Sequence, residues 1–418
     1  MKSSIKLHSL DKNNTFLSAM LAPIYAKYRI IWFKDNIFPG AELVNILQLK
    51  NQLRKTIASK LTSKEIHEAI RDHHARRKPR PCGMTIHTGI GCSLRCTYCY
   101  IEDMGFNWIV KPYPLTGLQL VYALLYNPYF VPGEYGTLIA IGSVTEPFLG
   151  VTREKTFEYI EAIATYLKNP IQFSTKMYLT RRDAYRLKQL DPGISPLITI
   201  ITIKYKDKLE PLAPPPEKRF ETIKNLRSTG LKPILFLRPI IPGIIEEEYV
   251  EILEKARDSG AVGVVVGSLR VTNRILDRLR KAGLDIGEII RRLPRKPRGR
   301  EQVPISTRDL KEEIIRYARK IGLIAFPEAC MANIYTHGRI CWKMIYHNIV
   351  VPGLEPPQIR MDELKKMAEE NNVVLRKIIR EKYFLKMLLE GDHISKALFS
   401  EYVKCRFGYC VRILGSNR

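Results

Sequence analysis

Three cysteines lie close together in the segment CSLRCTYC, residues 92–99. Cys92, Cys96 and Cys99 have the spacing C-x3-C-x2-C, and Tyr98 stands directly before the last cysteine. Three thiolates on one loop can hold three irons of a cubane cluster and leave the fourth iron open to a small molecule. Zinc sites usually pair two C-x2-C halves to reach four ligands. The spacing therefore favours an iron–sulfur cluster over zinc.

Strands and helices alternate from Pro81 to about Ala282. The predicted strands are Met84–Ile90, Thr137–Gly142, Ile171–Met177, Leu197–Lys204, Pro233–Arg238 and Val262–Ser268. The predicted helices are Thr116–Tyr126, Arg153–Lys168, Arg182–Leu190, Glu217–Ser228, Glu246–Ser259 and Thr272–Ala282. This alternation indicates parallel βαβ units with all strand carboxyl ends on one face. We therefore expect an α/β fold, a partial (βα)6 TIM-like barrel with the cysteine loop on that face.

Small and polar residues follow several of these strands. They are Gly142, Ser143, Thr145 and Glu146 after the second strand, Ser174, Thr175 and Lys176 after the third, and Arg238 at the end of the fifth. The segment LEPLAP, residues 209–214, follows the fourth strand. Each segment alone could be an ordinary cap or surface charge. Gathered on one face, they predict a site for an anion and a sugar.

The order of these motifs resembles the radical S-adenosylmethionine (SAM) superfamily, in the subgroup that includes spore photoproduct lyase and its uncharacterised relatives. The resemblance rests on the cysteine motif, GSVTEP, STK, LEPLAP and PIIPG, and it covers about residues 82–285. It implies that the three cysteines ligate a [4Fe–4S] cluster whose open iron binds SAM. It also implies reductive cleavage of SAM to a 5′-deoxyadenosyl radical, with reduced ferredoxin or flavodoxin as the electron donor.

The resemblance assigns a role to each polar segment. Gly142, Ser143, Thr145 and Glu146 match the segment that hydrogen-bonds the SAM amino group, and Ser174, Thr175 and Lys176 match contacts to the ribose and carboxylate. Arg238 stands at a carboxylate position, and Tyr98 is placed near the adenine. One feature departs from the photoproduct lyases, which use a cysteine near the second strand as hydrogen donor. This chain has no cysteine between residues 100 and 329, so the cofactor chemistry is implied and the DNA-repair substrate is not.

The chain of 418 residues is strongly basic, with a formal net charge of +26. Basic residues cluster in RRKPR at 76–80 and in RRLPRKPRGR at 291–300. Such clusters indicate a polyanionic partner, most often nucleic acid, although heat-adapted proteins also carry basic surfaces. We expect RNA, including tRNA, rather than DNA. Two other interpretations remain open: a radical SAM enzyme that modifies a peptide or protein, and a nucleic-acid-binding protein with a structural cluster.

Two flanking regions complete the expected organisation: a basic helical extension at 1–80 and a basic, α-rich domain at 286–418 around the core at 81–285. In the extension, Leu43, Ile46, Leu47 and Leu53 have helical spacing, and a second helix is predicted from Ser63 to about His74. His73 and His74 could be metal ligands, but a solvated helix end beside Arg76 and Arg77 is the favoured interpretation.

The C-terminal region holds four more cysteines, Cys330, Cys341, Cys405 and Cys410. They could form a four-thiolate site for a second iron–sulfur cluster or zinc, with His337 as a substitute ligand. The alternatives are buried free cysteines or disulfides. Glu355-Pro356-Pro357 reads as a linker, and Arg360–Glu390 is predicted to be largely helical.

No membrane span is expected, because the most apolar stretch, Phe16–Phe33, is interrupted by Lys27 and Arg29. The N-terminus lacks the apolar core and cleavage site of a signal peptide. We therefore expect a cytoplasmic protein, whose reduced thiols can hold metal.

Overall fold

A parallel sheet of seven strands forms the centre of the protein. The computed structural model describes residues 45–80, 83–353 and 359–415. The sheet contains β1 (Met84–Ile86), β4 (Ile139–Ile141), β5 (Ile171–Thr175), β6 (Ser195–Thr199), β7 (Ile234–Ile240), β8 (Gly263–Ser268) and β11 (Ile324–Phe326), in that spatial order. Every neighbouring pair is parallel. With β1 and β11 at its two edges, the sheet is open, which confirms the partial barrel.

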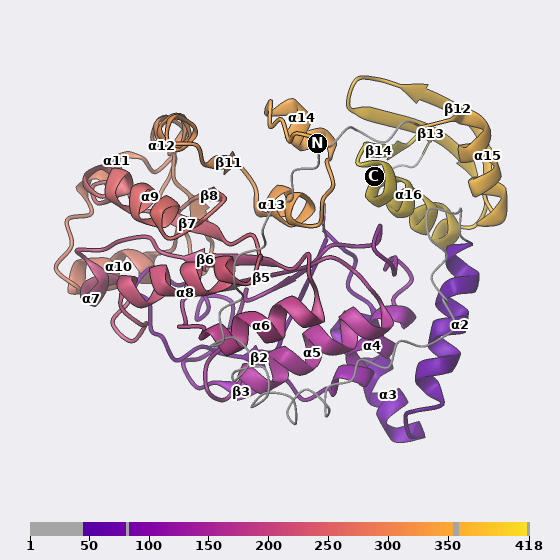
Figure 1. The fold of residues 1–418 in the computed structure, drawn as a ribbon, viewed down its shortest axis with the longest axis horizontal. Helices are drawn as coiled ribbons and strands as arrows, with labels where there is room; N and C mark the ends of the chain where they lie inside the picture. Colours follow the sequence, from indigo (N-terminus) through magenta and orange to yellow (C-terminus); the bar gives the residue numbers. More distant parts are fainter. Residues whose placement is uncertain (1–44, 81–82, 354–358, 416–418) are drawn as a thin grey trace, which may run out of the picture. The chain divides into compact units, whose positions relative to one another are not determined.

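Helices connect the parallel strands (Figure 1). They are α4 (Gly117–Tyr126), α5 (Arg153–Tyr166), α6 (Arg181–Leu190), α7 (Lys206–Leu209), α8 (Pro216–Ser228), α9 (Tyr249–Asp258), α10 (Asn273–Lys281), α11 (Gly287–Arg291) and α12 (Arg308–Lys320). Local sequence explains several starts: Thr116 and Thr180 close capping boxes with Gln119 and Asp183. The strands are apolar because helices cover them, and all five residues of β6 are buried.

The seventh strand was not among the six predicted from the sequence. β11 comes from the region assigned to the C-terminal domain, yet it pairs with β8, from Ile324 to Gly263 and from Phe326 to Val265. Helix α12 precedes it, so these two elements repeat the βα pattern once more. A strand of three residues carries too little periodicity to be distinguished from a loop.

The prediction of a largely helical segment at 360–390 is wrong. Helix α15 spans only Met361–Glu370, and an antiparallel hairpin follows, with β12 (Val374–Arg380) and β13 (Phe384–Glu390). The chain turns at Asn372, which has a φ of +56°. In β13, every second residue from Leu385 to Leu389 is buried, a period of two that indicates a strand. Many basic residues on the exposed face obscured that alternation.

The hairpin belongs to a small C-terminal subdomain. It contains β14 (Cys410–Ile413), which pairs with β13, and α16 (His393–Phe407), whose buried face includes Leu398 and Phe399 (Figure 1). Two short helices, α13 (Ala329–Thr336) and α14 (Trp342–Tyr346), lie between this subdomain and β11 along the chain. Two-stranded pairs complete the fold, β2 (Gly89–Ile90) with β3 (Lys111–Pro112) and β9 (Arg270–Val271) with β10 (Val303–Pro304).

The N-terminal helices pack on both the core and the C-terminal subdomain. They are α2 (Ile46–Ala58) and α3 (Ser63–Arg71), followed by the 3-10 turn η2 (His73–Ala75). The backbone N–H of Ile46 donates to Asn371 Oδ1 at 2.8 Å, and Ile46 shares an apolar cluster with Leu398. The first and last described parts of the chain therefore stabilise each other.

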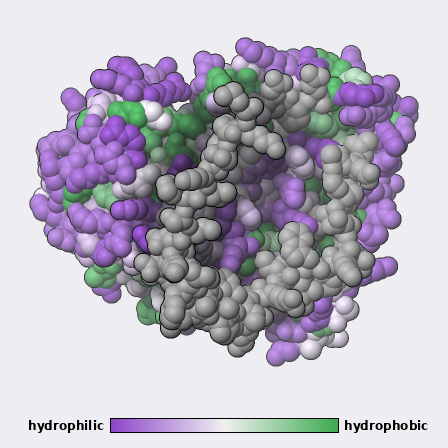
Figure 2. Space-filling model, viewed as in Figure 1, coloured by the Kyte–Doolittle hydropathy of each residue, from purple (hydrophilic) through white to green (hydrophobic). Residues whose placement is uncertain are grey.

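Several sequence features lie outside the described residues. They include Leu43, the apolar stretch 16–33 and the linker at 355–357. Within the described part of the chain, no helix has the length and apolarity to cross a membrane. The face drawn in Figure 2 is largely hydrophilic where residues are described, with apolar side chains in small groups.

Candidate functional site

The three predicted cluster cysteines lie on a loop directly after β2. Gly91 starts the loop with a φ of +82°, and a Cβ there would lie 2.3 Å from Ile109 O, so glycine is required. The backbone N–H of Cys92 donates to Asn107 O at 3.3 Å, and that of Cys99 donates to Cys96 O at 3.0 Å. These bonds fold residues 92–99 into a compact turn.

Arg278 of α10 fastens this loop from the other side. Its guanidinium donates to Thr97 O at 3.0 Å and also to Cys99 O, and it pairs with the carboxylate of Glu102. A planar group with five donors suits such a cluster of acceptors. Nothing in its helix marks Arg278 among the neighbouring basic residues, so this role was not predicted from the sequence.

Cys96 is buried, Cys92 and Cys99 are half-buried, and the charges of the latter two act on the Cys96 thiol. Burial raises the pKa of the Cys96 thiol to about 12, and Cys92 and Cys99 lie near enough to raise it further. Burial likewise raises the pKa of Cys92 and of Cys99. Lys176 opposes the shift in all three pKa values through its positive charge. Such thiols stay protonated until a cation binds, and a bound metal reverses that preference.

The predicted polar segments after β4 and β5 meet beside the cysteine loop. Glu146 is buried, and its carboxylate accepts from Thr175 Oγ1 at 2.5 Å and from the backbone N–H of Lys176 at 3.0 Å. The backbone N–H of Glu146 reaches the Cys92 sulfur. Tyr100, directly after the last cysteine, donates its hydroxyl to Ser143 O at 2.9 Å. The structure therefore brings the three segments into contact.

Gly142 and Ser174 explain how closely the two strand ends approach. Gly142 has a φ of +103°, and a Cβ there would lie 2.6 Å from Ser174 O. Ser174 Oγ donates to Gly142 O at 3.3 Å. Thr175 uses its hydroxyl within the fold, because it donates to Glu146 and accepts from the backbone N–H of Met177 at 2.9 Å. Contacts of these residues to SAM stay a prediction.

A buried network of charged residues contacts Tyr98 and Lys176. Glu210 and Arg219 are fully buried and form an ion pair, and Arg219 Nε also donates to Pro214 O at 2.9 Å. Tyr98 donates its hydroxyl to Glu210, and Lys176 Nζ lies 3.9 Å from Glu210 Oε1. Burial acts to raise the pKa of Glu210, but the charges of Arg219 and Lys176 outweigh it and lower that pKa. The carboxylate therefore stays ionised.

The residues present fit an iron–sulfur cluster with SAM. Three neighbouring thiols supply the ligands, and a carboxylate and a lysine stand beside them. Among the described residues, the buried Thr145 Oγ1 has no hydrogen-bond partner. Buried polar groups are nearly always paired, so this atom is suited to a ligand. The glycine at 142 lets the ends of β4 and β5 approach closely beside the cysteine loop.

Arg238 is not part of the hydrogen-bond network around Glu146. It lines a cavity of about 480 Å³. The cavity is also lined by Gln172 of β5 and by three more cations. These are Arg80, Arg270 and Lys311. Arg238 is near Tyr100, since its charge lowers the pKa of that tyrosine against the larger effect of burial. Arg238 therefore lies between this cavity and the residue that follows the cysteine loop.

Comparison with known proteins decides what this arrangement is. Residues 86–256, which include the cysteine loop, the segment after β4 and Arg238, match the Radical SAM superfamily. This stretch of the chain matches a radical SAM domain. The match begins in β1 and ends in α9, so it covers most of the barrel.

Two curated proteins match this chain over part of its length. A protein of Methanocaldococcus jannaschii is 30% identical over 173 residues, covering 38% of this chain, and a protein of Acidianus two-tailed virus is 25% identical over 190 residues, covering 41%. Both are named as uncharacterized, and this chain spans 61% of the length of each.

Two solved structures are among those that are similar to this chain. A spore photoproduct lyase mutant with bound AdoMet and dinucleoside spore photoproduct is 15% identical, with a TM-score of 0.49, over 65% of this chain and 90% of its own. SuiB of Streptococcus suis is 13% identical, with a TM-score of 0.40, over 86% of this chain and 67% of its own.

Outside the radical SAM domain, the four late cysteines are not all in one place. Cys341 and Cys405 both lie near Arg339, and Trp342 N donates to Gly408 O at 2.7 Å, which joins their two segments. Cys330 instead lines the cavity with Arg238. In the part of the chain that the structure describes, these thiols do not come within bonding range of one common ion. A second metal site there stays a prediction.

The interpretation of His73 and His74 as a solvated helix end is wrong for His74. Helix α3 ends at Arg71, because Asp72 adopts an extended conformation with a ψ of 149° and caps the following turn. That turn places His74 at 0% exposure. His337, the proposed substitute ligand, instead hydrogen-bonds Asn333 O at 2.8 Å through Nδ1.

Proposed function

We propose that this protein is an enzyme that cleaves SAM reductively and modifies a nucleic acid, with RNA as the first candidate. The observation that carries the SAM chemistry is the contact between the three-cysteine loop and the strand ends at 142–146 and 174–176. When bound, the cluster supplies the electron that splits the SAM sulfonium. Reduced ferredoxin or flavodoxin is the proposed source of that electron.

The protein's own residues have separable roles in this proposal. Cys92, Cys96 and Cys99 hold the cluster, and Arg278 fixes their loop. Thr145 offers a hydroxyl to SAM, and Glu146 orders the backbone after β5 while its charge favours the cofactor's amino group. These groups bind and orient; the cofactor carries the difficult bond cleavage.

The charge of the cavity supports an anionic substrate. Arg80, Arg238, Arg270 and Lys311 line it, whereas Glu328 is its one acidic lining residue. Burial and the charge of Arg238 lower the pKa of Lys311, which is the effect of like charges held close together. A phosphate group entering the cavity would relieve this repulsion. Phosphate contacts of this kind dominate nucleic-acid affinity.

A second cavity extends the basic surface beside the cysteine loop. It has a volume of about 430 Å³ and is lined by Arg274, Arg278, Lys281 and Arg300, with Asp103 and Asp277. Arg300 is the last residue of the predicted basic run at 291–300. Two other cations of that run are paired with acids, since Arg292 bonds Asp309 and Arg295 bonds Glu301. The proposed nucleic-acid contact therefore centres on Arg300 and α10.

The SAM chemistry is tested by Cys96→Ala after anaerobic reconstitution with iron and sulfide. We expect loss of the brown cluster absorbance and loss of 5′-deoxyadenosine formation on reduction with SAM. Ser93→Ala is the matched control, because Ser93 lies exposed on the same loop. Deoxyadenosine formation by Cys96→Ala would refute the assignment. A cluster without any SAM cleavage in the parent protein would instead indicate a structural cluster.

The nucleic-acid proposal is tested by replacing Arg274, Lys281 and Arg300 with glutamine. Binding to a tRNA should weaken, and the slope of log K against log salt should flatten by about 2, since each lost phosphate contact removes about 0.7–0.9. The control replaces three exposed lysines elsewhere, Lys365, Lys366 and Lys377. Equal effects in both triple variants would refute a specific surface. Parallel titrations with duplex DNA and with an acidic peptide test whether the protein binds RNA in preference to DNA or to a peptide.

A further inference from the structure

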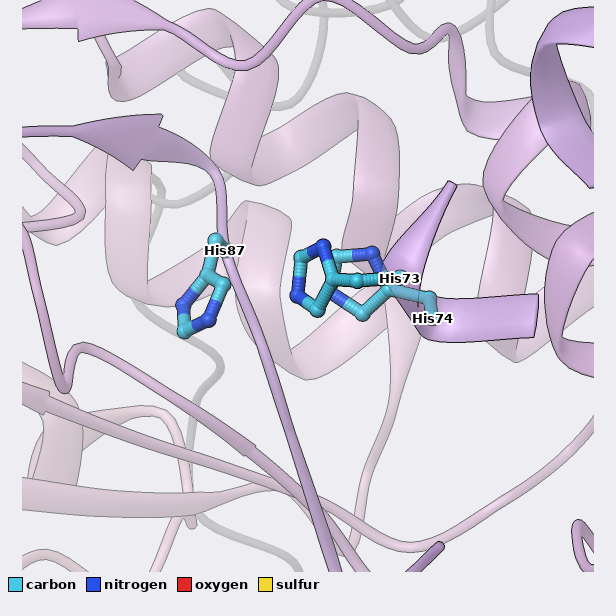
Figure 3. A group of neighbouring side chains, drawn as sticks. All are labelled: His73, His74 and His87. Carbon is cyan, nitrogen blue, oxygen red and sulfur yellow. The ribbon is translucent and has the colours of Figure 1, made fainter. Parts of the chain in front are cut away.

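Three histidines from two separate segments meet at the junction of the N-terminal extension and the barrel. His73 and His74 lie in the turn η2, and His87 directly follows β1 (Figure 3). Each offers a ring nitrogen, and the three nitrogens lie within 4.8 Å of one another. In the described residues, no other group of His, Cys, Asp and Glu side chains meets this criterion. Figure 3 shows His87 facing the other two rings.

Two ring nitrogens of this group are buried and lack any hydrogen-bond partner among the described residues. They are Nε2 of His74 and Nδ1 of His87. His74 cannot turn its Nε2 to a new partner without losing the hydrogen bond between its Nδ1 and Asp72 Oδ1, which is 2.6 Å long. Buried polar atoms are nearly always paired, so two unpaired ones in one group require an explanation.

The surroundings of the rings match those of metal-binding histidines. Asp72 accepts from His74 Nδ1, which fixes the tautomer whose Nε2 carries the free electron pair. Tyr113 donates its hydroxyl to Asp72 Oδ2 at 2.5 Å and lies 3.0 Å from His73 Nδ1. This carboxylate–histidine arrangement is the usual outer support of a metal ligand.

The electrostatics keep the ligands neutral and their support charged. Burial lowers the pKa of His73 to about 4 and that of His87 to about 3, so both rings carry free electron pairs at neutral pH. Burial acts to raise the pKa of Asp72, but hydrogen bonds from His74 and Tyr113 outweigh it and lower that pKa to about 2. The carboxylate opposes the repulsion that nearby Arg77 would exert on a cation.

We propose that His73, His74 and His87 bind one divalent transition-metal ion, with zinc as the reference ion, and that Asp72 orients His74. Ligand atoms around tetrahedral zinc lie about 3.3 Å apart, given bonds of about 2.0–2.1 Å. Small ring rotations would bring the three nitrogens to that spacing. Solvent can reach the group from the side of His73, whose side chain is 42% exposed.

A bound ion would join the extension to the barrel. His73 and His74 precede the basic segment 76–80, and His87 lies five residues before Cys92. Ring stacking already holds the two segments together, since the His73 and His87 centroids are 5.3 Å apart. Stacking does not satisfy the two buried nitrogens, whereas a metal ion would. The site is separate from the cluster cysteines and does not rest on the proposed function.

The test measures zinc affinity by competition with a chromophoric chelator, in the full-length protein containing its iron–sulfur cluster. His87→Gln and His73→Ala should each weaken zinc binding more than about 100-fold. Asp72→Asn should weaken it about 10–100-fold, as expected for an outer support. His67→Ala is the matched control, because His67 is exposed on α3 and does not belong to the group of three histidines. It should leave the affinity unchanged.

X-ray absorption at the zinc edge gives an independent readout. The parent protein with one equivalent of zinc should show nitrogen or oxygen neighbours at about 2.0–2.1 Å, and His87→Gln should lose them. A sulfur shell at about 2.3 Å that persists in His87→Gln would place the zinc at cysteines and overturn the proposal. Unchanged affinity in both histidine variants, or no zinc binding by the parent protein, would overturn it as well.

Discussion

Removal of Arg219 should destabilise the barrel and the cysteine loop together. Arg219 and Glu210 are both fully buried, and Glu210 also accepts from Tyr98, whose neighbours are cluster cysteines. Arg219→Met keeps most of the side-chain volume but leaves a buried carboxylate without its main partner. Breaking such a pair costs about 3–5 kcal/mol. Lys176, at 3.9 Å, retains part of the attraction and favours the lower half of that range.

The size of the effect can be converted into a melting temperature. Unfolding entropy is about 2.1 cal/mol/K per residue, which gives about 0.9 kcal/mol/K for 418 residues. A loss of 3–5 kcal/mol should therefore lower Tm by about 3–6 °C. The assay is thermal unfolding followed by circular dichroism, with iron content measured after reconstitution to report on the loop.

Two further variants serve as controls for this prediction. Arg182→Met removes an exposed arginine from α6 and should leave Tm nearly unchanged. Combining Arg219→Met with Glu210→Gln removes the stranded charge and should recover a large part of the lost stability, since Gln can still accept from Tyr98. If Arg219→Met melts within 1 °C of the parent, or the double variant is no more stable than the single one, the reasoning about a stranded charge is refuted.

Two smaller predictions follow from local geometry. Burial, with a contribution from Arg54, lowers the pKa of Lys50 to about 7. Between about pH 7 and 10 the unfolded chain therefore binds one more proton at Lys50 than the folded chain does, so the free energy of unfolding should rise with pH across this range. Lys50→Met should flatten this rise in urea unfolding, and parallel pH curves would contradict it. Gly142→Ala places a Cβ 2.6 Å from a backbone oxygen and should abolish SAM binding in equilibrium dialysis. Gly150→Ala, with open space around it, should not; equal binding by both variants would exclude a role for the close approach.

The barrel and its cofactor loop could be predicted because their signals are local. The spacing of Cys92, Cys96 and Cys99 sets which irons they can reach, and short apolar runs alternating with amphipathic helices permit few topologies. All six predicted strands are present in the structure. The start of α4 is marked by a local signal, the capping box between Thr116 and Gln119. Where a signal was weaker than its surroundings, as in the hairpin at 374–390, the prediction was wrong.

The remaining features depend on pairs of residues that only the folded chain brings together. Nothing in the sequence around Arg278 marks it as the clamp of the cysteine loop, and Glu210 is linked to Arg219 only because α8 turns back beneath Tyr98. By itself, the sequence determined the cysteine motif, the alternation of strands and helices in the barrel, and the basic character of the chain. The tertiary structure decided which cations line the cavities and that His74 is buried against His87, because burial and contact arise from packing and not from spacing along the chain.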